Sequence, residues 1–404
     1  MTNKTHIRPT DVRGYSRLAI DATLGLTRLV ETMHHNIARV PGPLGKYTQE
    51  PTRGITGLVY RSIQGTTRLV GSGIDALLGQ LLPLLEQEPK ASSGGREAVL
   101  SALNGVLGDH LAASANPLSI PMQLRRNGRP LTLTKPGLAA AFPAPTGKIL
   151  LLAHGLCMND LQWRRNGHDH GEALAAAGGY TPLYLHYNSG EHVSQNGHAL
   201  ADMLETLLQV WPVPVEKLVI IGHSMGGLLA RSACHYGRLT GHAWLSHLRQ
   251  LVFLGTPHHG APLERGGNWV NVVLELSPYT AALARLAKIR SAGITDLRHG
   301  DILDEDWQHG DRFAHARAKK SAMSLPQGVQ CFAMAASLSK TGGDPKKPLS
   351  GDGLVPLQSA LGRKKDGSHS LNFPASQQWV GYGMNHLDLL DDTKVYAQLR
   401  KWLC

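Results

Sequence analysis

Cysteine is scarce in this chain of 404 residues, which has four scattered copies and no C-x-x-C pair. This usage favours reduced thiols and argues against a disulfide framework or a metal finger. Aromatic residues make up only 5% of the chain, which is thin for a protein that stacks on nucleic-acid bases. We therefore expect no nucleic-acid partner, although the net charge is +11.

Long hydrophobic runs are also missing, since no apolar stretch approaches the ~18 residues that a spanning helix needs. The first residues are polar, and no apolar segment of a secretory signal follows them. The apolar share of 42% is enough for a large core. We expect a cytoplasmic protein. From the positive charge we also expect that it makes peripheral contact with anionic lipid, at a membrane or at a lipid body. Nothing in the sequence indicates an oligomeric state.

The first 120 residues show no strand-like alternation and predict a region of amphipathic helices. Part of this region is duplicated, because the glycines, leucines and Thr-Arg-Leu-Val of residues 14–30 recur at 54–70. A third helix is expected at 96–113. We predict one region of the chain at 1–120 and a second domain at 121–404.

From about residue 145 the pattern changes to short apolar strands that alternate with helices. Strands are expected at 148–153, 181–185, 217–221, 251–254 and 329–334, with helices at 198–210 and 226–236. This alternation predicts an α/β fold with a mostly parallel sheet covered on both faces. Residues 269–323 interrupt the rhythm and are too long for a bare loop, so we expect them to form a helical cap insertion.

The sequence Gly222-His223-Ser224-Met225-Gly226 directly follows one of these strands and precedes a helix. This is the context of a nucleophile elbow, in which a serine sits in a strained turn and the flanking glycines avoid collisions with neighbouring backbone. Ser224 is therefore the predicted nucleophile. We expect the backbone amides of Met225 and Leu156 to form the oxyanion hole, because Leu156 follows the end of another strand.

An orienting acid and a base should follow the nucleophile in chain order. Asp352 lies in a glycine-flanked turn after the last clear strand, and His386 follows a strand-like segment at 379–382. His154 and His258 are candidate substrate contacts, although a histidine beside a strand end or in a loop is often structural. The run at 187–190 is equally consistent with a pocket rim and a plain turn. Cys157 has no evident base and is treated as a bystander.

The HGL loop, the GHSMGG elbow, the GTPHHG segment, GDGLVP and NHLD together resemble bacterial lipases and esterases of the α/β-hydrolase superfamily. They are also similar to the lipase domain related to GPI inositol-deacylase. The resemblance runs from about residue 147 to the C-terminus. It implies an α/β-hydrolase fold and a triad of Ser224, Asp352 and His386, with no cofactor. Asp388 matches a calcium-binding position of some such lipases, but its second carboxylate cannot be placed, so no metal is predicted.

The sequence thus predicts a serine hydrolase of lipase or esterase type that cleaves carboxylic esters through an acyl-enzyme on Ser224. Apolar residues at 270–276 of the expected cap favour a hydrophobic ester substrate, and they are equally consistent with the core of the cap itself. Two alternatives stay open. The N-terminal amphipathic helices are also consistent with a scaffold that binds lipid, a granule or a partner, and the same triad serves thioester, amide or polyester bonds.

Overall fold

The computed structural model describes residues 9–38, 94–261, 291–308, 323–340, 351–364 and 369–404. The chain divides into two compact units, one of residues 1–90 with 113–118 and one of residues 91–112 with 119–404. Among the described residues, no helix is long and apolar enough to cross a membrane.

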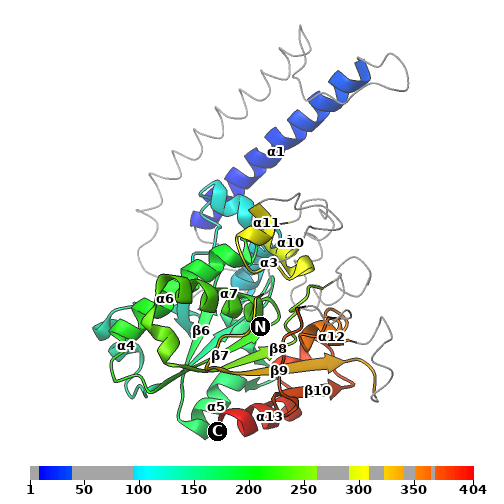
Figure 1. The fold of residues 1–404 in the computed structure, drawn as a ribbon. Helices are drawn as coiled ribbons and strands as arrows, with labels where there is room; N and C mark the ends of the chain where they lie inside the picture. Colours follow the sequence, from blue (N-terminus) through cyan, green and yellow to red (C-terminus); the bar gives the residue numbers. More distant parts are fainter. Residues whose placement is uncertain (1–8, 39–93, 262–290, 309–322, 341–350, 365–368) are drawn as a thin grey trace. The chain divides into compact units, whose positions relative to one another are not determined.

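The first unit contains helix α1 (Pro9–Ala38), drawn in blue in Figure 1. The segment 113–118 holds the start of this helix. The Asn116 side chain donates to the Gly14 carbonyl at 3.1 Å, and the Arg17 guanidinium donates to the Ala115 carbonyl at 3.0 Å. The predicted first copy of the duplicated segment lies on α1, and its second copy lies outside the described residues.

The second unit is built on an eight-stranded sheet with the strand order β10-β9-β8-β7-β3-β6-β1-β2. Neighbouring strands from β10 to β6 pair in parallel, and β1 pairs antiparallel with both β6 and β2. The strands are β1 (Gln123–Arg126), β2 (Arg129–Pro130), β3 (Lys148–Ala153), β6 (Thr181–His186), β7 (Lys217–His223), β8 (Leu248–Leu254), β9 (Gln330–Ser337) and β10 (Gln378–Tyr382). A small separate sheet pairs β4 (Arg164–Arg165) with β5 (His168–Asp169).

Helices cover both faces of the sheet (Figure 1). The helices described in this unit are α3 (Gly94–Ala113), α4 (Lys135–Ala141), α5 (His170–Gly178), α6 (Val193–Val210), α7 (Met225–Thr240), α10 (Ala292–His299), α11 (Glu305–Gln308), α12 (Leu357–Ala360) and α13 (Thr393–Leu403). Short 3-10 turns lie at η1 (Asp160–Trp163), η2 (Ala243–Ser246), η3 (Ala375–Gln377) and η4 (Asp388–Leu390).

The two-residue period of the strands explains the two cores. In β3, Ile149 and Leu151 face a core shared with α6 and α7, whereas Leu150 and Leu152 face a second core shared with α5 and α13. A strand buried on both faces needs the continuous apolar run that the sequence shows. The predicted α/β fold with a mostly parallel sheet is confirmed, with every expected strand present and β8 starting three residues earlier, at Leu248.

The boundary expected at residue 120 differs from the observed division, because helix α3 groups with the sheet unit. The reason is packing: Gly105 and Gly108 of α3 lie directly against Cys157 and Asn188 of the loops that follow β3 and β6. The expected cap is only partly described. Its described part, residues 291–308, contains α10 and α11, and the apolar residues at 270–276 lie outside the described residues.

Candidate active site

Ser224 occupies the turn between the end of β7 and the start of α7. Its φ of 53° and ψ of −121° form a left-handed conformation that is rarely adopted by a residue with a side chain. The turn is held by a hydrogen bond from the Ser224 amide to the Leu254 carbonyl, 2.8 Å, and by one from the Gly227 amide to the Ser224 carbonyl, 3.1 Å. Strain of this kind costs on the order of 1–3 kcal/mol and persists where surrounding contacts enforce it.

Close backbone approach explains the glycines on either side of Ser224. A Cβ atom at Gly222 would lie 2.5 Å from the Gly227 nitrogen, and one at Gly226 would overlap the Ala153 carbonyl at the end of β3. Helix α7 therefore begins in direct contact with the neighbouring strand. A serine in a strained turn between a strand and a helix, with close backbone contacts at both flanking glycines, is the local structure that the elbow motif predicts.

His386 and Asp352 meet in a buried pair. The Nδ1 atom of His386 lies 2.7 Å from Oδ2 of Asp352, and both side chains are buried. The other carboxylate oxygen, Oδ1, accepts from the amides of Leu354 and Val355 at 2.9 and 2.8 Å. Both carboxylate oxygens of Asp352 therefore have partners. Because Asp352 holds Nδ1 of the imidazole, Nε2 is the nitrogen left to exchange a proton.

The imidazole of His386 lies beside the elbow. Its ring centre is 4.6 Å from that of His223, the residue before Ser224, and Nε2 of His223 is 3.2 Å from the His386 carbonyl. A Cβ at Gly255, directly after β8, would lie 3.0 Å from Cε1 of His386. Nε2 of His386 is buried and has no hydrogen-bond partner within the described part of the chain. The carboxyl ends of parallel strands thus bring the three predicted triad positions to one edge of the sheet.

The two predicted oxyanion donors belong to segments that meet at Ser224: Met225 follows it directly, and Leu156 follows Gly155. Gly155 packs on Ser224, since a Cβ there would lie 3.0 Å from Cβ of Ser224. Within the described residues, the amides of Leu156 and Met225 have no hydrogen-bond acceptor. The next amide, of Cys157, is already used, because it donates to Oγ of Ser189 at 3.0 Å. Two unengaged donors beside a strained serine are what an oxyanion hole requires.

His154 is fully buried at the end of β3. Its ring stacks on Tyr187 with centres 4.4 Å apart, its Nδ1 lies 2.9 Å from the Gly155 carbonyl, and the Tyr187 hydroxyl donates to the His154 carbonyl. Burial, with the nearby His186, lowers the pKa of His154 to about 3, so it is neutral near pH 7. These contacts make it a support of the loop that carries Leu156. The run at 187–190 is buried as well and contacts this loop.

His258 also packs inside the protein. Its ring lies 4.8 Å from that of Phe253 and 5.6 Å from that of Phe373, and its Nδ1 is 3.3 Å from the guanidinium of Arg231. His258 therefore has the environment of a structural histidine, which was the alternative to a substrate contact. Burial lowers the pKa of His223 well below its usual range, and it raises the pKa of the Cys157 thiol to about 12. Cys157 is therefore a protonated thiol and not a second nucleophile.

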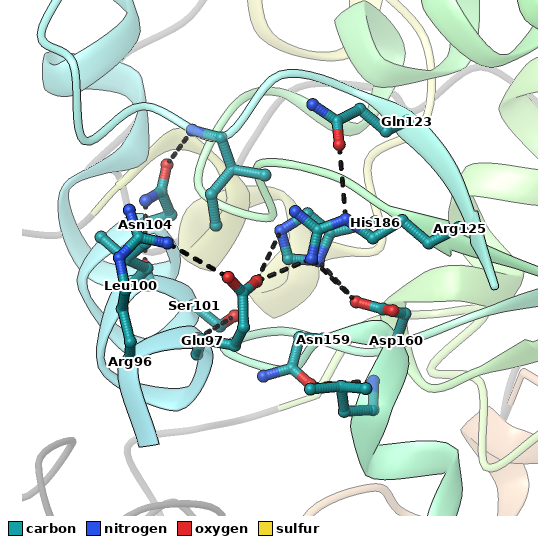
Figure 2. A network of polar contacts seen from close by, with 12 residues as sticks. Arg96, Glu97, Leu100, Ser101, Asn104, Gln123, Arg125, Asn159, Asp160 and His186 are labelled. Carbon is teal, nitrogen blue, oxygen red and sulfur yellow. Dashed lines mark hydrogen bonds and ion pairs between the residues drawn. The ribbon is translucent and has the colours of Figure 1, made fainter. Parts of the chain in front are cut away.

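Figure 2 shows a buried ion network that the sequence analysis did not identify. The Arg125 guanidinium lies 2.7 Å from Oε2 of Glu97 and 3.2 Å from Oδ1 of Asp160, and Nδ1 of His186 lies 3.1 Å from the same Asp160 oxygen. Burial alone would raise the pKa of Asp160, but the close contact with His186 and the charge of Arg125 outweigh it and lower that pKa. The signal in the sequence was the polar stripe at positions 97, 101 and 104 of α3, which are spaced to share one helix face.

This network is also the one set of potential metal ligands that the described residues contain, with one ligand atom each from Glu97, Asp160 and His186 within 4.8 Å of one another. A metal ion there would face the guanidinium of Arg125, which already serves as counter-ion to both carboxylates. The donor set therefore fits an internal ion network better than a metal centre. Asp388 accepts from the Asn385 amide at 2.7 Å and so closes the turn that follows β10.

Comparisons with known proteins place these residues in context. Residues 144–331, just under half of the chain, match the family model described as the PGAP1-like alpha/beta domain. No curated protein matches the chain. Among solved structures, a mature lipase from Bacillus licheniformis is 18% identical with a TM-score of 0.41, and the match covers 63% of this chain and 91% of that one. An esterase from Pyrococcus furiosus is 14% identical with a TM-score of 0.37, and the match covers 64% of this chain and 80% of that one. An alpha/beta hydrolase superfamily protein from Enterococcus faecalis is 17% identical with a TM-score of 0.38, and the match covers 64% of this chain and 91% of that one.

Proposed function

We propose that this chain, whose residues 144–331 match the PGAP1-like alpha/beta domain, is a serine hydrolase that cleaves carboxylic esters through an acyl-enzyme on Ser224. The observation that carries the proposal is the 2.7 Å contact between His386 and Asp352, set beside a strained elbow with Nε2 of His386 unengaged within the described residues. A buried histidine that is oriented in this way, with one nitrogen unengaged and its ring against the turn that carries a serine, is suited to general-base catalysis.

In the proposed mechanism, neutral His386 takes the proton of Ser224 through Nε2 as the hydroxyl oxygen attacks the ester carbonyl. Asp352 stabilises the imidazolium that forms, through its 2.7 Å contact with Nδ1. The amides of Leu156 and Met225 donate to the oxyanion, and the helix α7 that begins at Met225 directs its positive end at the same place. The imidazolium then protonates the leaving alcohol, and water removes the acyl group by the same steps.

The proposed substrate is a hydrophobic ester, supported by the apolar sequence at 270–276. Peripheral contact with anionic lipid is proposed from the net charge of +11. His154 and His258 are not included among the proposed substrate contacts, because the ring packing described above uses both side chains inside the fold.

A fluorophosphonate probe followed by peptide mapping tests the nucleophile. We expect label on Ser224 alone, and its loss in Ser224→Ala together with a fall in p-nitrophenyl ester turnover of about 10⁴-fold or more. Ser246→Ala, an exposed serine in η2, is the matched control and should keep both. Full ester turnover by Ser224→Ala would refute the proposal.

A substrate panel separates the bond types that the same triad serves. Esters of increasing acyl length, with matched thioesters and amides, are compared by kcat/KM. We expect esters to be preferred and the rate to rise with acyl length. A preference for the amide or the thioester would keep the nucleophile and replace the ester assignment.

A further inference from the structure

Helix α3 lies against the loop that carries the proposed oxyanion donor. At Gly105 the helix backbone meets Cys157, the residue after Leu156: a Cβ at Gly105 would overlap the Cys157 sulfur and would lie 3.0 Å from the Cα and backbone nitrogen of Cys157. Backbone atoms cannot swing aside as the end of a flexible side chain can. The position of the 155–158 loop is therefore limited by the absence of a side chain at residue 105.

The same loop is held from its other side. The Cys157 amide donates to Oγ of Ser189, the Met158 amide donates to the Gly155 carbonyl at 3.3 Å, and Cys157 itself has a left-handed φ of 61°. A left-handed φ in a residue with a side chain indicates that its surroundings enforce the conformation. The Cys157 amide is committed to Ser189, whereas the Leu156 amide beside it has no acceptor among the described residues and is available to an oxyanion.

Helix α3 is itself fixed to the rest of its unit at several points along its packed face. Near its start, Glu97 pairs with Arg125 of β1 in the network of Figure 2. Farther along, the Gly105 carbonyl accepts from Ser291 at 2.6 Å, and the Gly108 carbonyl accepts from Asn188 at 2.9 Å. The helix therefore forms a fixed wall behind Cys157 and does not rest loosely on the surface.

From these contacts we infer that Gly105 is a positioning residue for the oxyanion hole: helix α3 acts through Cys157 to set where the Leu156 amide points. This inference rests on the proposed function. It assigns a role in the reaction to a helix that precedes the residues matched by the family model. A displaced oxyanion donor is expected to lower kcat with little change in KM, because the donor acts mainly on charge that develops in the transition state.

The test compares Gly105→Ala with Gly94→Ala. Both are glycines of α3, but a Cβ at Gly94 meets no atom within 4 Å. Alanine favours a helix over glycine, so a loss at residue 105 does not reflect a weaker helix. Burst titration with a p-nitrophenyl ester counts active sites, and kcat is expressed per titrated site. We expect Gly105→Ala to lower kcat by about 10- to 100-fold with KM changed by less than about threefold, and Gly94→Ala to match the original protein.

Rescue separates positioning from general damage. Cys157→Gly removes the sulfur that an alanine at residue 105 would overlap, and glycine accepts the left-handed φ at this position. The double variant Gly105→Ala/Cys157→Gly should recover at least about a tenth of the original kcat if Gly105→Ala has lost 100-fold. Should Gly105→Ala not fold, Ser189→Ala, which removes only the acceptor of the Cys157 amide, is expected to lower kcat by about tenfold at unchanged KM.

The outcomes are distinct. A folded Gly105→Ala with the original kcat per titrated site, or a Ser189→Ala protein with unchanged kcat, overturns the positioning role. Failure of the fluorophosphonate to label Ser224 in the original protein overturns the proposed function instead. A fall in kcat at constant KM that Cys157→Gly reverses supports the inference.

Discussion

Acid should destabilise this protein through its buried neutral histidines, and His170 allows the effect to be measured away from the proposed triad. His170 is fully buried at the start of α5, where its Nε2 contacts the Leu389 carbonyl at 3.1 Å and its Nδ1 contacts Nε2 of His168 at 2.8 Å. Burial, with a contribution from the charge of His168, lowers the pKa of His170 from 6.5 to about 3.

Between these two pKa values the unfolded chain binds more protons at this residue than the folded protein does. The free energy of unfolding therefore falls as the pH falls from 6.5 toward 3, and the stabilisation is fully present above pH 6.5. At about 1.36 kcal/mol per pH unit, lowering the pH from 7.5 to 5.5 removes about 1.4 kcal/mol through His170 alone. Burial lowers the pKa of His154 to about 3 as well. A comparable loss through His154 would bring the total to a sizeable share of the free energy of unfolding, which is roughly 5–15 kcal/mol for folded domains.

Urea denaturation at pH 7.5 and pH 5.5 measures the effect. In His170→Gln the side-chain amide can still donate to the Leu389 carbonyl but does not titrate. We expect its difference in unfolding free energy between the two pH values to be smaller than that of the original protein by about 1.4 kcal/mol, whatever its own stability. His110→Gln, a substitution near the end of α3, controls for the exchange itself. The reasoning is refuted if His170→Gln and the original protein lose the same free energy.

Three further outcomes are expected. Asp352→Asn keeps an oxygen for the amides of Leu354 and Val355 but can no longer hold His386 as the carboxylate does, so ester kcat should fall by about 10⁴-fold with the melting temperature changed by only a few degrees; a loss below about tenfold contradicts the assigned role. Arg125→Met removes the guanidinium that the buried carboxylates of Glu97 and Asp160 share and should cost about 3–5 kcal/mol of unfolding free energy in urea at pH 7.5; an unchanged midpoint would show that the network is not formed. Ellman's reagent should titrate one thiol per native chain, the exposed Cys404, and four in urea, because the other cysteines are buried; rapid reaction of more than one native thiol would contradict this burial.

The strands and the elbow could be predicted from the sequence because their determinants are local. An apolar run such as Ile149 to Ala153, bounded by turn residues, is typical of a strand buried on both faces. Ser224 has glycines on both sides, at the positions where neighbouring backbone leaves no room for a side chain. Ser224, Asp352 and His386 could be grouped from the sequence because each follows a predicted parallel strand, and the loops after parallel strands lie at the same edge of the sheet.

Other features depended on contacts between residues far apart in the chain. Whether His154 and His258 face a substrate or pack inside was open until the rings of Tyr187 and Phe253 were seen against them. Helix α3 was expected to belong with the N-terminal helices, because its helical pattern says nothing about which surface it covers. Gly105 against Cys157, and Glu97 against Arg125, decide that it belongs to the sheet unit.

The sequence by itself determined the element types and was enough to propose the catalytic residues, because periodicity, turn residues and motif spacing act over a few residues. Tertiary structure alone decided which polar side chains are buried together and which helix supports the loop of Leu156. Those outcomes depend on shape and charge complementarity between segments that lie from tens to hundreds of residues apart, and a local pattern does not record them.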